Sequence, residues 1–224
     1  MRMLNVKSKS RLTVAVALAV IILFVGCPRS EPSSEGTWYV VKTVLDGDTI
    51  ILADNRRVRY LGIDTPELGH GGKPGQPYSR EARDVNASIV QKSKVALTVG
   101  AEPRDRYGRT LAYVTTQAGV EVNLELIRRG AAFFLADASQ ERKFDRQMLK
   151  IQRQAMADGV GMWQDWREPP VPSGGYVGNR RSRRFHHPDC REARKISPRN
   201  RQRLDSQWRA FNEGFAPARG CMQP

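Results

Sequence analysis

The sequence predicts a β-rich α+β protein, with a five-stranded barrel of the OB type, packed helices and a small C-terminal domain. Three observations indicate this architecture. Five short runs rich in β-branched and aromatic residues are separated by turn signals, as in small barrels. A helix-like apolar stripe lies between the third and fourth runs. A segment rich in proline and glycine then divides this body from a basic tail.

The five expected strands lie between Trp38 and Thr116. Asp46-Gly47 forms a turn between the first two, and Asp54-Asn55 forms another before the third. The third run alternates polar and apolar side chains over several positions, as a strand with one buried face does. The expected strands are Trp38–Val44, Thr49–Leu52, Arg57–Ile63, Lys94–Val99 and Leu111–Thr116.

Three helices are expected around these strands. Tyr78–Lys92 carries apolar residues at helical spacing and follows the third strand. Val122–Arg129 is followed by Gly130, and Gln140–Asp158 by Gly159. Glycine is the usual residue just beyond a helix C-terminus, so both ends are well marked.

Composition excludes several classes of protein. The 224 residues carry a net charge of +14, and 40% of them are hydrophobic, which excludes a wholly disordered chain. No apolar run reaches the eighteen or so residues of a membrane-spanning helix, which excludes a polytopic membrane protein. Three cysteines are too few for a disulfide scaffold. The excess positive charge lies in the N-terminal segment and the tail, and anions are the expected partners, nucleic acid first.

Residues 1–27 are typical of an export signal. Basic residues precede the apolar run Leu12–Val25, which as a helix would span only about 21 Å, too short for a bilayer. Phe24-Val25-Gly26-Cys27 looks like a bacterial lipoprotein cleavage box, whose cysteine becomes lipidated. A lipid on Cys27 would attach the protein to a membrane. Ordinary cleavage nearby and a retained anchor remain open. We expect an exported protein, either held in the cell envelope or secreted.

Five polar residues around the strands form the candidate site. Asp48 and Asp64 offer hard oxygen ligands suited to Ca²⁺ or Mg²⁺. Arg59 and Arg109 offer permanently charged forks suited to phosphate oxygens. Glu67, close to Asp64, could take a proton from a water near the metal. Each is weak evidence alone, but together they are the groups that phosphodiester hydrolysis requires.

Three blocks of sequence resemble the signature blocks of the staphylococcal nuclease family. They are Asp46-Gly47-Asp48-Thr49, the stretch from Arg59 to Asp64-Thr65-Pro66-Glu67, and Asp105–Tyr113. Their order matches, and the similarity runs over about residues 38–163. The resemblance implies an OB-fold barrel and Ca²⁺-dependent hydrolysis of DNA and RNA, leaving 3′-phosphorylated ends.

The same resemblance implies roles for individual residues. Asp48, Asp64 and the backbone carbonyl of Thr65 would hold Ca²⁺. Glu67 would be the general base, either directly or by orienting the attacking water. The phosphate would be bound by two arginines, Arg59 and Arg109.

A non-catalytic OB-fold protein that binds nucleic acid is the alternative. Such a protein would need the arginines but would have no use for the carboxylates, which repel phosphate. The joint presence of both kinds of residue therefore favours an endonuclease of low sequence specificity, and we expect a monomer.

The tail is similar to the small zinc domain of the bacterial alkylation-repair protein Ada. His186 and Cys190 fit its first ligand pair and Cys221 fits its last position, but Ala218 stands where the third ligand belongs. Both Zn²⁺ binding by His186, Cys190 and Cys221 and a Cys190–Cys221 disulfide remain open. A metal or redox sensor is a weaker hypothesis, which Ala218 opposes. The many arginines of the tail could contact phosphates without reading sequence.

These interpretations divide the chain into five segments. They are an export signal at 1–27, a linker at 28–36, a nuclease-like OB-fold domain at 37–166, a second linker at 167–175 and a basic Ada-type metal-binding-like domain at 176–224.

Overall fold

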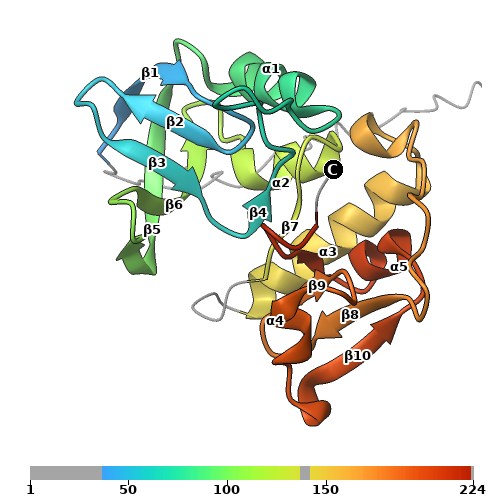
Figure 1. Cartoon of the computed structure of the whole chain (residues 1–224). Helices are drawn as coiled ribbons and strands as arrows, with labels where there is room; N and C mark the ends of the chain where they lie inside the picture. Colours follow the sequence, from blue (N-terminus) through green and yellow to red (C-terminus); the bar gives the residue numbers. More distant parts are fainter. Residues whose placement is uncertain (1–36, 137–141, 223–224) are drawn as a thin grey trace, which may run out of the picture. The chain divides into compact units, whose positions relative to one another are not determined.

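The computed structural model describes residues 37–136 and 142–222 (Figure 1). The expected signal at 1–27, the linker at 28–36 and the lipidation site Cys27 lie outside the described residues and stay predictions. Among the described helices, none combines the length and apolar character needed to cross a bilayer.

Five strands close into a barrel in the order β1-β2-β3-β6-β5. β3 and β6 pair in parallel, and the other neighbours pair antiparallel. Ile50, Val58 and Val95 are fully buried inside it. The predicted five-stranded barrel is confirmed. Its strands are β1 (Tyr39–Val44), β2 (Thr49–Leu52), β3 (Arg57–Tyr60), β5 (Lys94–Arg104) and β6 (Thr110–Thr116).

Two strands differ from their expected bounds by more than one residue. The predicted strand Arg57–Ile63 ends early, because Gly62 adopts a left-handed φ of 74° and turns the chain out of the barrel. The residues beyond it form β4 (Ile63–Asp64), which pairs with β7 (Phe133–Phe134) in a separate two-stranded sheet. β5 runs past the predicted Val99, because its pairing with β6 resumes at Arg104 after a shift in register.

Helices pack on the barrel at the expected places. α1 (Ser79–Val90) follows β4, and α2 (Val122–Arg128) follows β6. α3 (Arg142–Ala157) leads into a short 3-10 helix, η1 (Gly161–Trp163). Gly130 has a left-handed φ of 60°, and a Cβ there would lie 2.0 Å from the carbonyl oxygen of Val160. Only glycine therefore lets the end of α2 meet the start of η1 so closely.

The C-terminal part forms its own four-stranded sheet in the order β10-β8-β9-β11. Figure 1 labels β8, β9 and β10 of this sheet. Only β9 and β11 pair in parallel. Short helices connect the strands. The elements are β8 (Tyr176–Asn179), β9 (Arg184–His186), α4 (Arg191–Arg194), η2 (Pro198–Asn200), β10 (Arg201–Leu204), α5 (Gln207–Asn212) and β11 (Ala216–Pro217).

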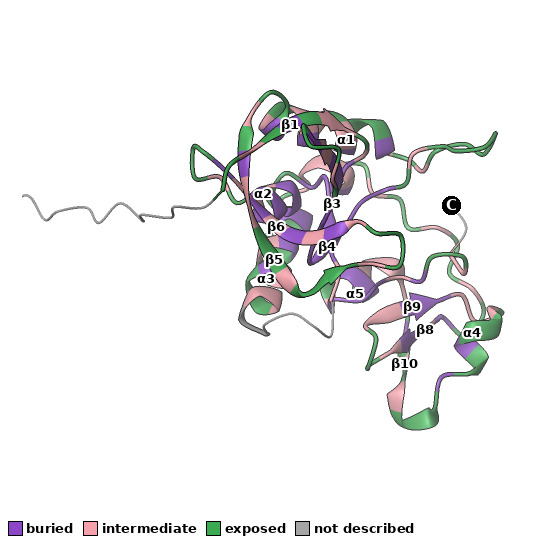
Figure 2. Cartoon of the chain, turned by 90° about the vertical axis from the view of Figure 1, so that its left-hand side faces the viewer, coloured by how far each residue is buried: buried purple, intermediate pink, exposed green. Residues whose placement is uncertain are grey.

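This sheet and the barrel portion share one hydrophobic cluster. Phe133 and Trp163 pack with Phe211, with ring centroids 5.2 Å apart in each pair. Figure 2 shows buried residues at α2 and β4 and again at β8 and β9. The described residues 37–136 and 142–222 accordingly belong to one compact unit. The expected linker carries contacts as well, since the Glu168 carboxylate accepts a 3.0 Å hydrogen bond from the Trp208 N–H at the start of α5.

A buried glutamine connects the two sheets. Gln152 on α3 is fully buried. Its Oε1 accepts from the N–H of Phe134, and its Nε2 donates to the carbonyl of Phe211, both at 2.6 Å. One side chain thus satisfies a backbone group on β7 and another on α5.

Replacing Gln152 with Leu should lower the free energy of unfolding by about 2–4 kcal/mol, because two buried backbone groups lose their partners. Urea unfolding with an unchanged m-value measures this loss. Gln154→Leu is the matched control on the exposed face of α3 and should change stability by less than about 0.5 kcal/mol. Equal effects of the two variants would contradict the role of Gln152.

Candidate functional site

One buried arginine brings together the two predicted cation ligands. Arg59 on β3 places Nη1 3.0 Å from Oδ2 of Asp48 and Nη2 2.7 Å from Oδ1 of Asp64. Asp48 lies in the turn before β2, and Asp64 ends β4. The exposed fractions of Asp48, Arg59 and Asp64 are 3%, 6% and 2%. The three residues therefore form one buried ion-paired group.

The turn that carries Asp48 is built by its neighbours. Asp46 Oδ1 accepts a 2.9 Å hydrogen bond from the N–H of Asp48. A Cβ on Gly47 would lie 2.7 Å from the Thr65 side chain, so glycine is needed for the two segments to meet. Thr65 Oγ1 donates to Asp48 Oδ2 at 3.1 Å. The Asp-Gly-Asp motif and the segment after Asp64 are thus fixed against each other.

The carboxylate oxygens of Asp48 and Asp64 are suitable ligands for a hard divalent cation. Burial raises the pKa of Asp48 to about 7, even though the charge of Arg59 opposes the rise. A buried carboxylate of this kind needs positive charge nearby to stay ionised. Two carboxylates held on one guanidinium offer the oxygen ligands that Ca²⁺ and Mg²⁺ take. The remaining ligands would have to be backbone carbonyls or water.

Glu67 lies at the edge of the site, where it pairs with Arg219, and half of its side chain is exposed. It begins a loop whose base is closed by Gln76. The Gln76 Oε1 accepts from the N–H of Glu67 at 2.7 Å, and the Gln76 N–H donates to the Glu67 carbonyl at 2.8 Å. The backbone of Glu67 is therefore fixed three residues beyond Asp64.

Arg109 lies in one cleft with Arg59 and Asp64, and the carboxylate of Asp105 holds its side chain. Asp105 Oδ2 lies 2.7 Å from both Nε and Nη2 of Arg109. Arg59, Asp64 and Arg109 line a cleft of about 440 Å³. Its remaining basic residues are Arg104, Arg106, Arg184 and Arg219. The structure therefore places Asp48, Arg59, Asp64, Thr65, Glu67 and Arg109 at or beside one cleft.

Two arginines of this cleft come from the C-terminal part, and the sequence interpretation did not assign them to the site. Arg184 Nη1 lies 3.7 Å from Asp64 Oδ2, and Arg219 forms ion pairs with Asp64 and Glu67. Arg219 lies 155 positions from Asp64 along the chain, so no local pattern could join them. The basic composition of the tail was the one available signal.

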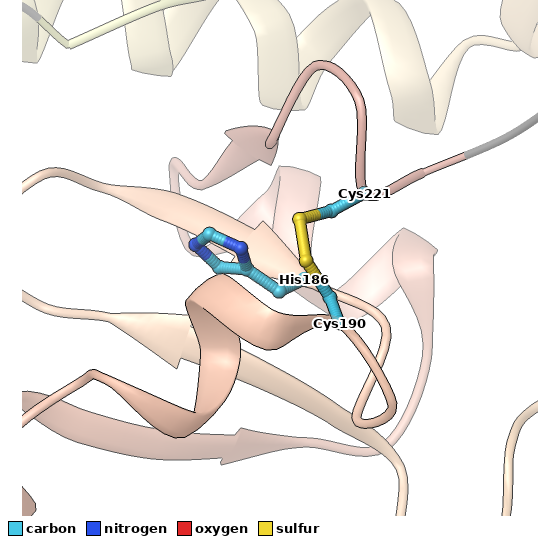
Figure 3. Close-up of side chains that lie close together, drawn as sticks. All are labelled: His186, Cys190 and Cys221. Carbon is cyan, nitrogen blue, oxygen red and sulfur yellow. A yellow bond between two sulfur atoms is a disulfide. The ribbon is translucent and has the colours of Figure 1, made fainter.

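The predicted zinc ligands lie together in the C-terminal part (Figure 3). The donor atoms of His186, Cys190 and Cys221 lie within 4.8 Å of one another. Cys190 and Cys221 form a disulfide with a Cα–Cα distance of 5.5 Å. His186 Nδ1 is buried without a hydrogen-bond partner in the described part of the chain. The group could hold a metal only with both thiols reduced, because a disulfide sulfur is not a thiolate ligand.

Sequence comparison relates this chain to known proteins. A family model described as staphylococcal nuclease homologue matches residues 57–165. Thermonuclease of Staphylococcus intermedius is 38% identical over 130 residues, 54% of this chain and 76% of the relative. Thermonuclease of Staphylococcus hyicus is 33% identical over 172 residues, 70% of this chain and 98% of the relative.

A third relative comes from another genus. Endonuclease YncB of Bacillus subtilis (strain 168) is 31% identical over 159 residues, covering 69% of this chain and 71% of the relative. The matched family segment includes Arg59, Asp64, Glu67 and Arg109, and Asp48 precedes it. Since these relatives are matched over most of their length, the chain belongs to the staphylococcal nuclease family.

Proposed function

We propose that this protein is a Ca²⁺-dependent endonuclease that acts as a monomer and hydrolyses phosphodiester bonds in DNA and RNA with low sequence specificity. The observation that carries the proposal is the buried group of Asp48, Arg59 and Asp64 beside an arginine-lined cleft. Relatives named thermonuclease and endonuclease support the hydrolytic nuclease class.

The arginines would bind the phosphate. Arg59 and Arg109 are oriented by carboxylates, Arg59 by Asp48 and Asp64 and Arg109 by Asp105, so little conformational freedom remains to be lost on binding. Negative charge that builds up on the phosphoryl oxygens would be neutralised by these fixed guanidinium groups. Phosphate contacts carry no base information, which fits low sequence specificity.

Glu67 would take the proton of the attacking water. Its carboxylate is half exposed at the rim, next to Asp64, where water and substrate can reach it. Asp48, Asp64 and the Thr65 carbonyl would hold Ca²⁺, which when bound supplies positive charge to the phosphoryl oxygens. A pure binding protein would be weakened by these carboxylates, so the binding alternative is not adopted.

The proposal predicts a large effect of Glu67→Gln. Loss of the general base should lower kcat on single- and double-stranded DNA by about 10²- to 10⁴-fold, and a chelator should abolish cleavage by the wild type. Glu102→Gln is the matched control, because Glu102 is an exposed glutamate lining the same cleft. Glu102→Gln should leave kcat within about threefold. Glu67→Gln with wild-type kcat would overturn the role of Glu67.

We propose that metal binding by His186, Cys190 and Cys221 depends on whether the two cysteines are oxidised or reduced. In an exported protein the Cys190–Cys221 disulfide is the favoured form. Under reducing conditions His186, Cys190 and Cys221 could take Zn²⁺, with water as a fourth ligand. Kinship of residues 176–224 with the Ada-type zinc domain rests on the spacing of these residues and remains a prediction.

We propose export on the sequence of residues 1–27 alone, which is typical of an export signal. If Cys27 is lipidated, the protein should sediment with membranes after cell fractionation, and Cys27→Ser should release it to the soluble fraction. The wild type and Cys27→Ser would fractionate alike if cleavage were ordinary or the apolar run were a retained anchor, and that result would contradict lipidation.

A further inference from the structure

Arg219 bridges the two carboxylates on which the proposed chemistry depends. Its Nη1 lies 2.7 Å from Glu67 Oε1. Its Nη2 donates to Asp64 Oδ1, and its Nε donates to Asp64 Oδ2 at 3.3 Å. The guanidinium therefore faces both a proposed cation ligand and the proposed general base.

Asp64 has little free capacity left beside these contacts. Its Oδ1 accepts from both Arg59 and Arg219, and its Oδ2 accepts from Arg219 and has Arg184 at 3.7 Å. A carboxylate offers about four acceptor positions, so three of them are already used, and the positive charge of Arg184 stands 3.7 Å from the Oδ2 that carries the fourth. A divalent cation that binds Asp64 must displace a donor. Arg59 is buried, whereas half of the Arg219 side chain is exposed, so Arg219 is the donor that can withdraw.

The segment that carries Arg219 is anchored on both sides. Before it, β11 pairs with β9, and the N–H of Ala218 donates to the Phe185 carbonyl at 2.8 Å. After it, Cys221 is joined to Cys190 by the disulfide. The backbone is thus held beside the cleft while the side chain remains able to swing away.

The charge of Arg219 is secure in this position. A guanidinium is protonated at neutral pH, and this one lies against the carboxylates of Asp64 and Glu67. A permanent positive charge at Asp64 repels any second cation that approaches the same oxygens.

We propose that Arg219 competes with the divalent cation for Asp64 and Glu67 and so sets the affinity of the nuclease for that cation. This inference rests on the proposed function. A polynucleotide would offer Arg219 phosphate oxygens in place of the carboxylates, so substrate and cation would favour each other's binding. The C-terminal part would thereby make cation binding depend on the presence of substrate.

The test is calorimetric titration of Ca²⁺ alone into the full chain, without nucleic acid. Arg219→Gln removes the charge at a half-exposed position and should lower the Kd for Ca²⁺ about tenfold. Arg219→Lys keeps the charge but loses the planar fork and should lower the Kd to a smaller extent. An unchanged Tm for each apo protein establishes that the variants are folded.

Arg191→Gln is the matched control. It removes one arginine from the same part of the chain. The Arg191 side chain is 86% exposed, and its Nε lies 3.7 Å from Oε1 of Glu192. The Kd of this variant for Ca²⁺ should equal that of the wild type. A Kd for Arg219→Gln within twofold of the control would overturn the competition.

Cleavage assays separate this inference from the proposed function. Ca²⁺-dependent cleavage by the wild type, with equal Kd values in the wild type and Arg219→Gln, would retain the nuclease and reject the role of Arg219. A lower kcat for Arg219→Gln at saturating Ca²⁺ with no change in Kd would make Arg219 a phosphate-binding residue instead. Absence of both Ca²⁺ binding and cleavage in the wild type would reject the two proposals together.

Discussion

The rest of the site depends on one buried ion-paired group, the guanidinium of Arg59 between Asp48 and Asp64. Charges this deeply buried are tolerated only when they are paired, since an isolated buried charge is strongly destabilising. The pairing draws the turn before β2, the strand β3 and the strand β4 to one end of the barrel. It leaves two carboxylates for one buried guanidinium, and Arg219 of the C-terminal part supplies a second positive charge to Asp64.

Asp64 is the point at which the two parts of the chain meet. It reaches its position because Gly62 turns the chain out of the barrel and β4 then pairs with β7. β7 is tied through Gln152 to α5 of the C-terminal part. The same part returns Arg219 to the carboxylate of Asp64. Packing and ion pairs therefore couple the basic tail to the cleft.

Local patterns were enough to predict the barrel and most of the candidate site. Strands such as Thr49–Leu52 were predicted within their observed bounds, because side-chain character and turn residues report on local backbone. Asp48, Arg59 and Asp64 lie within seventeen positions of one another and fall in recognisable blocks. The early end of β3 was missed because Gly62 looked like any residue of an alternating strand. Arg219 was missed because its partner is 155 positions away and no motif links the two.

The most direct measurement of the central claim is cleavage of single- and double-stranded DNA by the wild-type chain with Ca²⁺ present or removed by chelation. The buried carboxylate pair beside an arginine-lined cleft predicts cleavage of both substrates with Ca²⁺ and none with chelator. Retained DNA binding with no cleavage in any divalent cation would contradict the account, and would identify the barrel as a binding protein that keeps the arrangement without its chemistry.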